Sequence, residues 1–121
     1  MGSHLTRRYV TSTETEPDPQ SKPSFDPNIG FGERQERVMV ATAEQMRDAQ
    51  VPVDLRDYCA HHMIMWLKCK RDNFPDIFAC GHQKHAWEKC QHDDYVMRMK
   101  EYERERRLLE RKQRLDQKQA A

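Results

Sequence analysis

Cys59-AHHMIMWLK-Cys69 and Cys80-GHQKHAWEK-Cys90 decide the fold of this chain, and their four cysteines are the only ones among its 121 residues. Within each pair, the second cysteine follows the first by ten positions. On an α-helix this step separates two residues by about 15 Å along the axis. A disulfide requires Cα atoms within about 7 Å of each other. Each cysteine must therefore bond to a partner on a second helix.

Pro75 lies between the two motifs and predicts a turn that makes the two helices antiparallel neighbours. This geometry pairs Cys69 with Cys80 beside the turn, and Cys59 with Cys90 one helix length away. The predicted fold is all-α, a helical hairpin held by two disulfides. Because two helices alone bury little apolar surface, the crosslinks should supply much of the stability.

The predicted hairpin domain covers residues 54–92. Asp54, with Asp57 three residues later, should cap its first helix. Trp66 and Trp87 each follow the first cysteine of their pair by seven positions. Both tryptophans should therefore pack between the two bridges as core residues.

A zinc site and a redox centre are the competing interpretations of the cysteines. Zinc sites usually contain close pairs such as Cys-x2–4-Cys, and a redox centre usually contains Cys-x-x-Cys, but the sequence has neither. Five histidines near the motifs could still supply metal ligands: His61, His62, His82, His85 and His92. The spacing favours disulfides, so we predict no metal site, no cofactor and no catalytic residue.

The composition excludes several classes of protein. Charged residues make up 34% of the chain and hydrophobic residues 36%, with a net charge of +1. General nucleic-acid binders are strongly basic, so this balance argues against that function. The longest apolar run is Met63–Leu67, far below the roughly 20 residues that a membrane-spanning helix needs.

Residues 1–32 are predicted to form an extended N-terminal arm. The segment Met1–Thr6 matches the N-myristoylation pattern, with Gly2 as the acyl site. The same residues are also compatible with an unmodified N-terminus or with an expression tag. Prolines interrupt residues 9–32, which form either a disordered linker or a tail that wraps a partner. Three apolar side chains could anchor such a tail: Phe25, Ile29 and Phe31.

Residues 33–50 should form an amphipathic helix that Pro52 ends. Met39, Ala43 and Met46 share one stripe of this helix. Such a narrow stripe should pack on a partner or on the hairpin of the same chain.

Residues 93–121 contain no Gly or Pro and should extend the second hairpin helix into a long, charged one. Three acid–base pairs at i,i+4 support it: Asp94→Arg98, Glu103→Arg107 and Glu110→Arg114. This helix is either solvated or a lever that lies across neighbouring subunits. Its arginines would also permit an RNA-binding function, but the acidic residues interleaved with them argue against it.

The cysteines and the N-terminal sequence together suggest a cellular compartment. Four cysteines in a small domain point to an oxidising environment. The N-terminal sequence has no apolar core of a secretory signal, and its early acidic residues do not suit a matrix-targeting peptide. This combination predicts the mitochondrial intermembrane space.

The paired Cys-x9-Cys motifs resemble the coiled-coil-helix–coiled-coil-helix (CHCH) family of that compartment. The segments RDYCAHHMIMWLKCKRDNFPD and DDYVMRMKEYERERRLLERK are more closely similar to the beta-subcomplex subunit 7 family of mitochondrial NADH:ubiquinone oxidoreductase, respiratory complex I. The likeness extends from the acylation pattern to the charged C-terminal helix.

This resemblance implies an accessory, non-catalytic subunit, peripheral to the inner membrane on its intermembrane-space side and bound to other complex I subunits of the distal membrane arm. It implies import as a reduced chain, with the disulfide relay oxidase docking on Met63, Trp66 and Cys69, and myristate on Gly2. The alternative is a free CHCH protein that acts as a metallochaperone or an import and assembly factor. Such proteins carry an extra Cys-Cys or Cys-Pro-Cys site, and this sequence has no fifth cysteine.

Overall fold

The computed structural model describes residues 2–30 and 37–121, which divide into two compact units. The hairpin unit contains Gln35–Val96, and the arm unit contains Met1–Arg34 with Met97–Ala121. The predicted anchor Phe31 and the predicted start of the helix at residue 33 lie outside the described residues.

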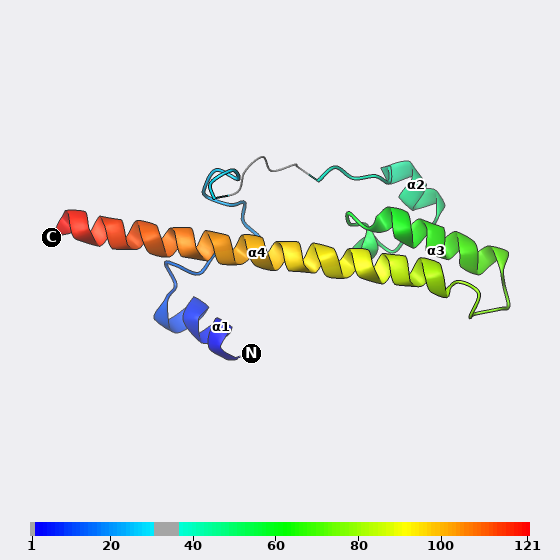
Figure 1. The fold of residues 1–121 in the computed structure, drawn as a ribbon, viewed down its shortest axis with the longest axis horizontal. Helices are drawn as coiled ribbons and strands as arrows, with labels where there is room; N and C mark the ends of the chain where they lie inside the picture. The colour runs from blue at the N-terminus through cyan, green and yellow to red at the C-terminus, as the bar shows by residue number, and fades with distance from the viewer. Residues whose placement is uncertain (1, 31–36) are drawn as a thin grey trace. The chain divides into compact units, whose positions relative to one another are not determined.

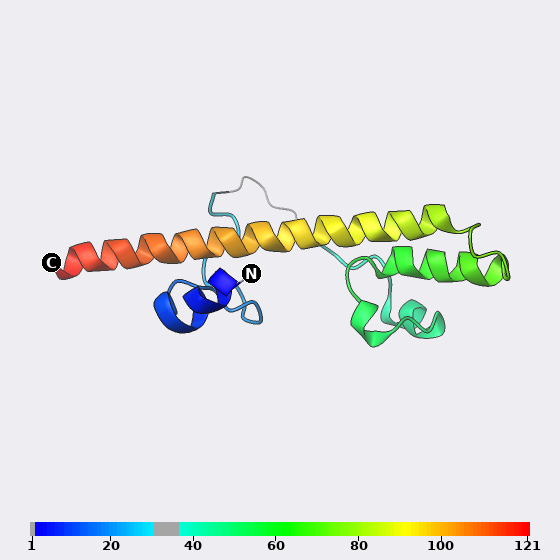
Figure 2. The same cartoon turned by 90° about the horizontal axis from the view of Figure 1, so that it is seen from below.

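The hairpin unit is built on two antiparallel helices, α3 (Ala60–Asp72) and the first part of α4 (Gly81–Ala120), which lie side by side (Figures 1 and 2). The chain reverses between them, and the Phe74–Pro75 peptide bond in the reversal is cis. The described residues contain helices and no strand, so the predicted all-α fold is confirmed. The predicted continuation of the second hairpin helix into a long charged helix is also present, since α4 reaches Ala120.

The start of α3 differs from the prediction, because Asp54 does not cap it. Val53–Leu55 form a short 3₁₀-helix, and α3 begins only at Ala60. Asp57 acts at this end instead, where its Oδ1 accepts a hydrogen bond from the backbone N–H of Cys59 at 2.9 Å. Aspartate side chains commonly bond the backbone two residues further on, and here that local bond prevails over an earlier helix start.

The helix predicted over residues 33–50 is also shorter in the structure. The helix α2 spans only Ala43–Asp48, and residues 37–42 before it are not helical. Thr42 and Gln45 form a capping box, with backbone-to-side-chain distances of 3.2 Å and 3.0 Å. This reciprocal pair satisfies two otherwise unpaired N–H groups and fixes the first turn.

The buried core of the hairpin unit is small. Its members come from α2, α3 and the segments beside them: Ala41, Met46, Val51, Ala60 and Met63. Trp66 and Trp87 pack against this cluster, with their rings stacked at a centroid distance of 5.5 Å. The tryptophans are therefore core residues between the two helices, as predicted. Since Met46 belongs to the same cluster as Met63, α2 packs on the hairpin of its own chain.

The arm unit combines the N-terminal residues with the second part of α4. The arm is not extended throughout, because Gly2–Thr6 form the helix α1 and Arg7–Thr11 form a turn of π-helix, η1. The first proline of the chain is Pro17, so nothing in residues 2–11 removes the backbone donors that a helix needs. Residues 12–30 are irregular and contain turns.

No helix in the described part of the chain has the length and the apolar composition needed to cross a bilayer.

Candidate functional site, the disulfide-bonded hairpin

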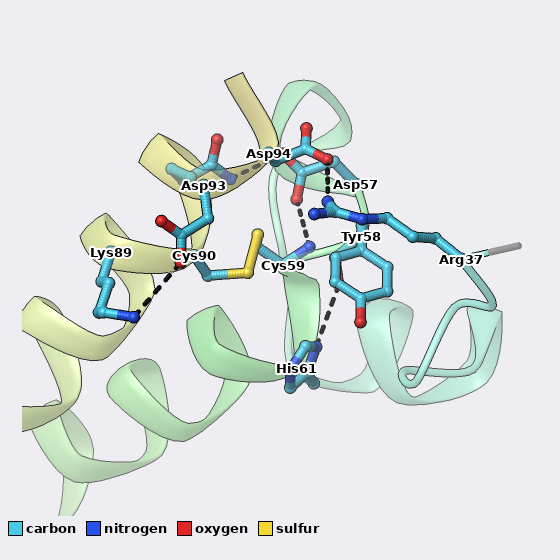
Figure 3. The surroundings of a disulfide bond; sticks show 10 residues. Arg37, Asp57, Tyr58, Cys59, His61, Lys89, Cys90, Asp93 and Asp94 are labelled. Atoms are coloured by element: carbon cyan, nitrogen blue, oxygen red, sulfur yellow. Dashed lines mark hydrogen bonds and ion pairs between the residues drawn. A yellow bond between two sulfur atoms is a disulfide. The ribbon is translucent and has the colours of Figure 1, made fainter. Parts of the chain in front are cut away.

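Both predicted disulfides are present, and each joins the α3 side of the hairpin to the α4 side. Cys59 bonds Cys90 with an S–S distance of 2.06 Å and a Cα–Cα distance of 5.9 Å (Figure 3). Cys69 bonds Cys80 with an S–S distance of 2.24 Å, also at a Cα–Cα distance of 5.9 Å. All four cysteines are thereby used, and none remains as a free thiol.

The bridges lie inside the hairpin rather than on its surface. Cys59 and Cys80 are buried, and Cys69 and Cys90 are half-buried. A thiolate is the reactive form of cysteine in nucleophilic and metal chemistry. Since every thiol is bonded, the oxidised hairpin offers a rigid frame and no reactive sulfur.

Asp57 forms a polar crosslink next to the Cys59–Cys90 bridge, the outer disulfide of the hairpin. One of its carboxylate oxygens accepts a hydrogen bond from the backbone N–H of Cys59 (Figure 3). The other accepts a hydrogen bond from Nε2 of Gln91 at 2.7 Å. The same side chain therefore orders the start of α3 and ties it to α4. Sequence reasoning missed this role, because it assigned Asp57 to a capping box with Asp54.

Arg37 connects the segment before α2 to the same end of the hairpin. Its guanidinium forms an ion pair with Asp94 at 2.5 Å and stacks over the ring of Tyr58 at 4.8 Å (Figure 3). Nδ1–H of His61 donates to the backbone carbonyl of Tyr58 at 3.1 Å. The sequence predicted a local pair of Asp94 with Arg98, and it did not predict the pair of Asp94 with Arg37, which lies 57 residues away in the sequence.

Met63, Trp66 and Cys69, the predicted docking residues for the relay oxidase, lie on the inner face of α3. Met63 is buried, and Cys69 forms a disulfide with Cys80. Trp66 stacks on Trp87, and the Lys70 ammonium lies over the Trp66 ring at 5.0 Å from its centre. The closed hairpin therefore covers much of this face. Gly2, the predicted acyl site, lies at the start of α1.

The histidines are not brought together as a metal site. The rings of His61 and His62 are close, at a centroid distance of 4.1 Å, and burial together with the neighbouring ring lowers the pKa of His62. His82, His85 and His92 are exposed on α4. Nowhere in residues 2–30 and 37–121 do three side chains of the types His, Cys, Asp and Glu form a cluster that could hold a metal ion.

A groove of about 970 Å³ lies along α3 on the side of α2. Its lining is mostly apolar and includes Val40, Ala49, Ile64 and Met65. Lys68 and Arg71 add positive charge to the lining, and Asp48 adds negative charge. Sequence reasoning did not identify this surface, because it arises only when α2 packs beside α3.

The arm is bonded to α4 through buried and half-buried polar groups. Glu16 is buried, forms an ion pair with Arg7 at 3.1 Å and accepts a hydrogen bond from the hydroxyl of Tyr102. Burial and this bond raise the pKa of Tyr102 to about 12. Nε of Arg104 donates to the carbonyl of Ile29 at 2.8 Å. The predicted tail thus has specific partners on its own chain.

The same part of α4 carries local ion pairs. Arg106 contacts Glu103 at 2.7 Å and also pairs with Glu110, while Arg107 contacts Glu103 at 3.1 Å. The hydrogen bond from Arg106 is the main cause that lowers the pKa of Glu103 to about 2. The predicted pair of Glu103 with Arg107 is therefore present.

The comparisons with known proteins agree with this geometry. A family model described as the NADH-ubiquinone oxidoreductase B18 subunit matches residues 40–102, which include α2, α3 and both disulfides. The chain belongs to the B18 subunit family.

Several relatives with the printed name NADH dehydrogenase (ubiquinone) 1 beta subcomplex subunit 7 are similar over most of their length. The protein from Mus musculus is 60% identical over 94% of this chain and 83% of the relative. The protein from Bos taurus is 58% identical over 99% of this chain and 88% of the relative. The protein from Caenorhabditis elegans is 46% identical over 87% of each chain. The resemblance noted in the sequence is therefore confirmed, and the B18 family match covers the whole hairpin.

Proposed function

We propose that this chain is an accessory, non-catalytic structural subunit of mitochondrial respiratory complex I. It lies peripherally on the intermembrane-space face of the inner membrane and holds neighbouring subunits of the distal membrane arm together. The observation that carries this proposal is that every cysteine is used in a disulfide that braces a hairpin, in a chain whose relatives are named as complex I subunits.

The hairpin suits a structural role because it is ordered before any partner binds. Binding is weakened when side chains and loops must be ordered at the interface, and a preformed surface avoids that cost. The two disulfides fix the relative position of α3 and α4 at two levels. Exposed apolar side chains of this unit, such as Met65, Ile77 and Phe78, are then available as contact surfaces.

Oxidation is expected to follow import of a reduced chain. Met63, Trp66 and Cys69 would be read by the relay oxidase before the hairpin closes, since Met63 is buried once it has closed. The thiolate of Cys69 would attack the disulfide of the oxidase, forming a mixed disulfide and releasing one thiol of the oxidase. Cys80 would then attack the mixed disulfide, which closes the Cys69–Cys80 bridge and leaves the oxidase as a dithiol.

Gly2 would carry a myristoyl group that adds membrane contact. One acyl chain gives only marginal and reversible membrane binding, so protein contacts must supply the rest. The acyl chain would therefore strengthen the attachment of the subunit without being its main anchor.

The test is native electrophoresis and intact mass of the chain isolated from mitochondria. We expect it to migrate with complex I at fixed stoichiometry, and its thiols to alkylate only after reduction. Myristoylation would add about 210 Da to the chain. A free, copper-loaded monomer would instead support the metallochaperone alternative. Four thiols that alkylate without prior reduction would contradict the disulfide-bonded hairpin.

A further inference from the structure

The loop that joins α3 to α4 displays three large apolar side chains to solvent. Phe74 is 83% exposed, Ile77 is 80% exposed and Phe78 is 86% exposed. We call residues 73–79 the tip loop; it is the reversal at the end of the hairpin in Figures 1 and 2. A reversal of this kind in a free protein normally carries polar residues, and clustered exposed apolar groups mark an interaction site.

The tip loop is fixed by bonds of its own. The inner disulfide, Cys69–Cys80, closes the base of the loop. Nδ2 of Asn73 donates to the carbonyl of Cys69 at 2.9 Å, and the N–H of Asp76 donates to the carbonyl of Asn73 at 2.8 Å. Oδ1 of Asp76 accepts the N–H of Phe78 at 2.9 Å. The apolar side chains are therefore presented by an ordered backbone, and binding a partner involves little further free-energy cost for ordering the loop.

The charges around the loop indicate which kind of partner fits it. Two basic residues and one acidic residue precede Phe74 in the sequence: Lys70, Arg71 and Asp72. A second acidic residue, Asp76, lies between Phe74 and Phe78. All four charged residues are exposed. Anionic headgroups attract Lys and Arg, and the negative charges of Asp72 and Asp76 would weaken that attraction. Aromatic anchors surrounded by charges of both signs are typical of a protein–protein interface.

We propose that the tip loop is the anchor of a protein contact, in which Phe74, Ile77 and Phe78 fill an apolar pocket of another complex I subunit. This rests on the proposed function and adds the place and the chemistry of one contact. The partner's pocket is apolar at its centre, and its edge carries an acidic group for Arg71 and a hydrogen-bond donor or cation for Asp76.

The test uses the full chain in cells that lack the endogenous subunit. The tip variant is Phe74→Ser/Ile77→Ser/Phe78→Ser, and the matched control is Val10→Ser/Val53→Ser, whose side chains are 74% and 77% exposed. Neither variant removes a buried group, so both should form their disulfides and unfold like the unchanged chain. We expect the unchanged chain and the control to enter complex I, and the tip variant to enter it at least about tenfold less.

Two further measurements identify the partner class. Hydroxyl-radical oxidation of Phe74 and Phe78 should fall at least about fivefold in the purified complex relative to the free oxidised chain, because the pocket excludes water. The free chain should show no loop-dependent binding to phosphatidylcholine vesicles that contain phosphatidylglycerol.

The outcomes separate the two proposals. Failure of the unchanged chain to enter complex I would refute the proposed function and the tip contact together. If the unchanged chain enters but the tip variant enters equally well, or both phenylalanines remain equally oxidised, only the tip contact is refuted. Vesicle binding that the tip variant loses would overturn the protein contact in favour of a lipid surface.

Discussion

Removal of the outer disulfide should destabilise the hairpin more than removal of the inner one. The two variants are Cys59→Ala/Cys90→Ala and Cys69→Ala/Cys80→Ala. They change the same residue types and differ only in which bridge is lost, so each serves as the control for the other. Each also removes one buried cysteine and one half-buried cysteine, which makes their packing losses similar.

The expected difference comes from the loop that each bridge closes in the unfolded chain. The inner bridge spans a sequence separation of 11, and the outer bridge spans 31. While the inner bridge is intact, the outer one closes a path of roughly 22 residues, so the chain-entropy model assigns it about 3.4 kcal/mol. With the outer bridge intact, loss of the inner one costs about 2.5 kcal/mol on the same model. The outer bridge should therefore contribute about 1 kcal/mol more to the free energy of unfolding.

Urea denaturation followed by tryptophan fluorescence measures this difference. Trp66 and Trp87 are the only tryptophans of the chain, and they stack on each other inside the hairpin, so the signal reports on this unit alone. Equal losses for the two variants, or a larger loss for the inner bridge, would refute the entropic reasoning. A loss below about 1 kcal/mol for either variant would show that the packed residues hold the hairpin without its crosslinks.

Three other predictions concern single side chains. Trp66→Ala removes the stacked ring and should lower the free energy of unfolding by about 2 kcal/mol. This loss is smaller than for a fully buried tryptophan, because Trp66 is half-buried. Urea denaturation, followed by the fluorescence of the remaining tryptophan, measures the loss. Glu103→Gln should abolish a pH effect on α4. The folded pKa of Glu103 is about 2, below the usual 4.5, so its pairing with Arg106 stabilises the helix above pH 4.5 and is lost as the pH falls towards 2. Far-UV circular dichroism between these pH values should show the loss in the unchanged chain and not in the variant. Tyr102→Phe should remove a phenol that ionises near pH 12, and the absorbance of the phenolate measures this loss. In the unchanged chain, the stability contributed by the neutral phenol of Tyr102 is present below pH 10 and is lost as the pH rises towards 12.

The disulfide pairing could be predicted because it depends on strict local geometry. A ten-residue step forbids bonding within one helix, and one short turn leaves a single antiparallel arrangement. The stacking of Trp66 on Trp87 then followed, because both lie at the same offset from a bridged cysteine. These conclusions needed only spacing, so no knowledge of the rest of the chain was required.

Other features depend on competition between signals, or on residues far apart in the sequence. The stripe of Met39 and Met46 favoured a longer helix, but the capping box of Thr42 with Gln45 begins the helix after Met39. That box was readable in the sequence as a Thr-x-x-Gln pattern. The pair of Arg37 with Asp94 was not readable, because it spans 57 residues and exists only after the hairpin has closed.

The small core and the exposed surface of the hairpin unit have one explanation. A protein that relies on hydrophobic burial alone risks alternative packing when large apolar side chains are available at its surface. In this unit the position of α3 against α4 is set by covalent bonds, so Phe74 and Phe78 can remain exposed without offering the helices a competing arrangement. Stability and recognition are thereby assigned to different residues. Changes to Phe74 and Phe78 should therefore alter assembly and leave the free energy of unfolding unchanged, whereas changes to the bridges should alter both.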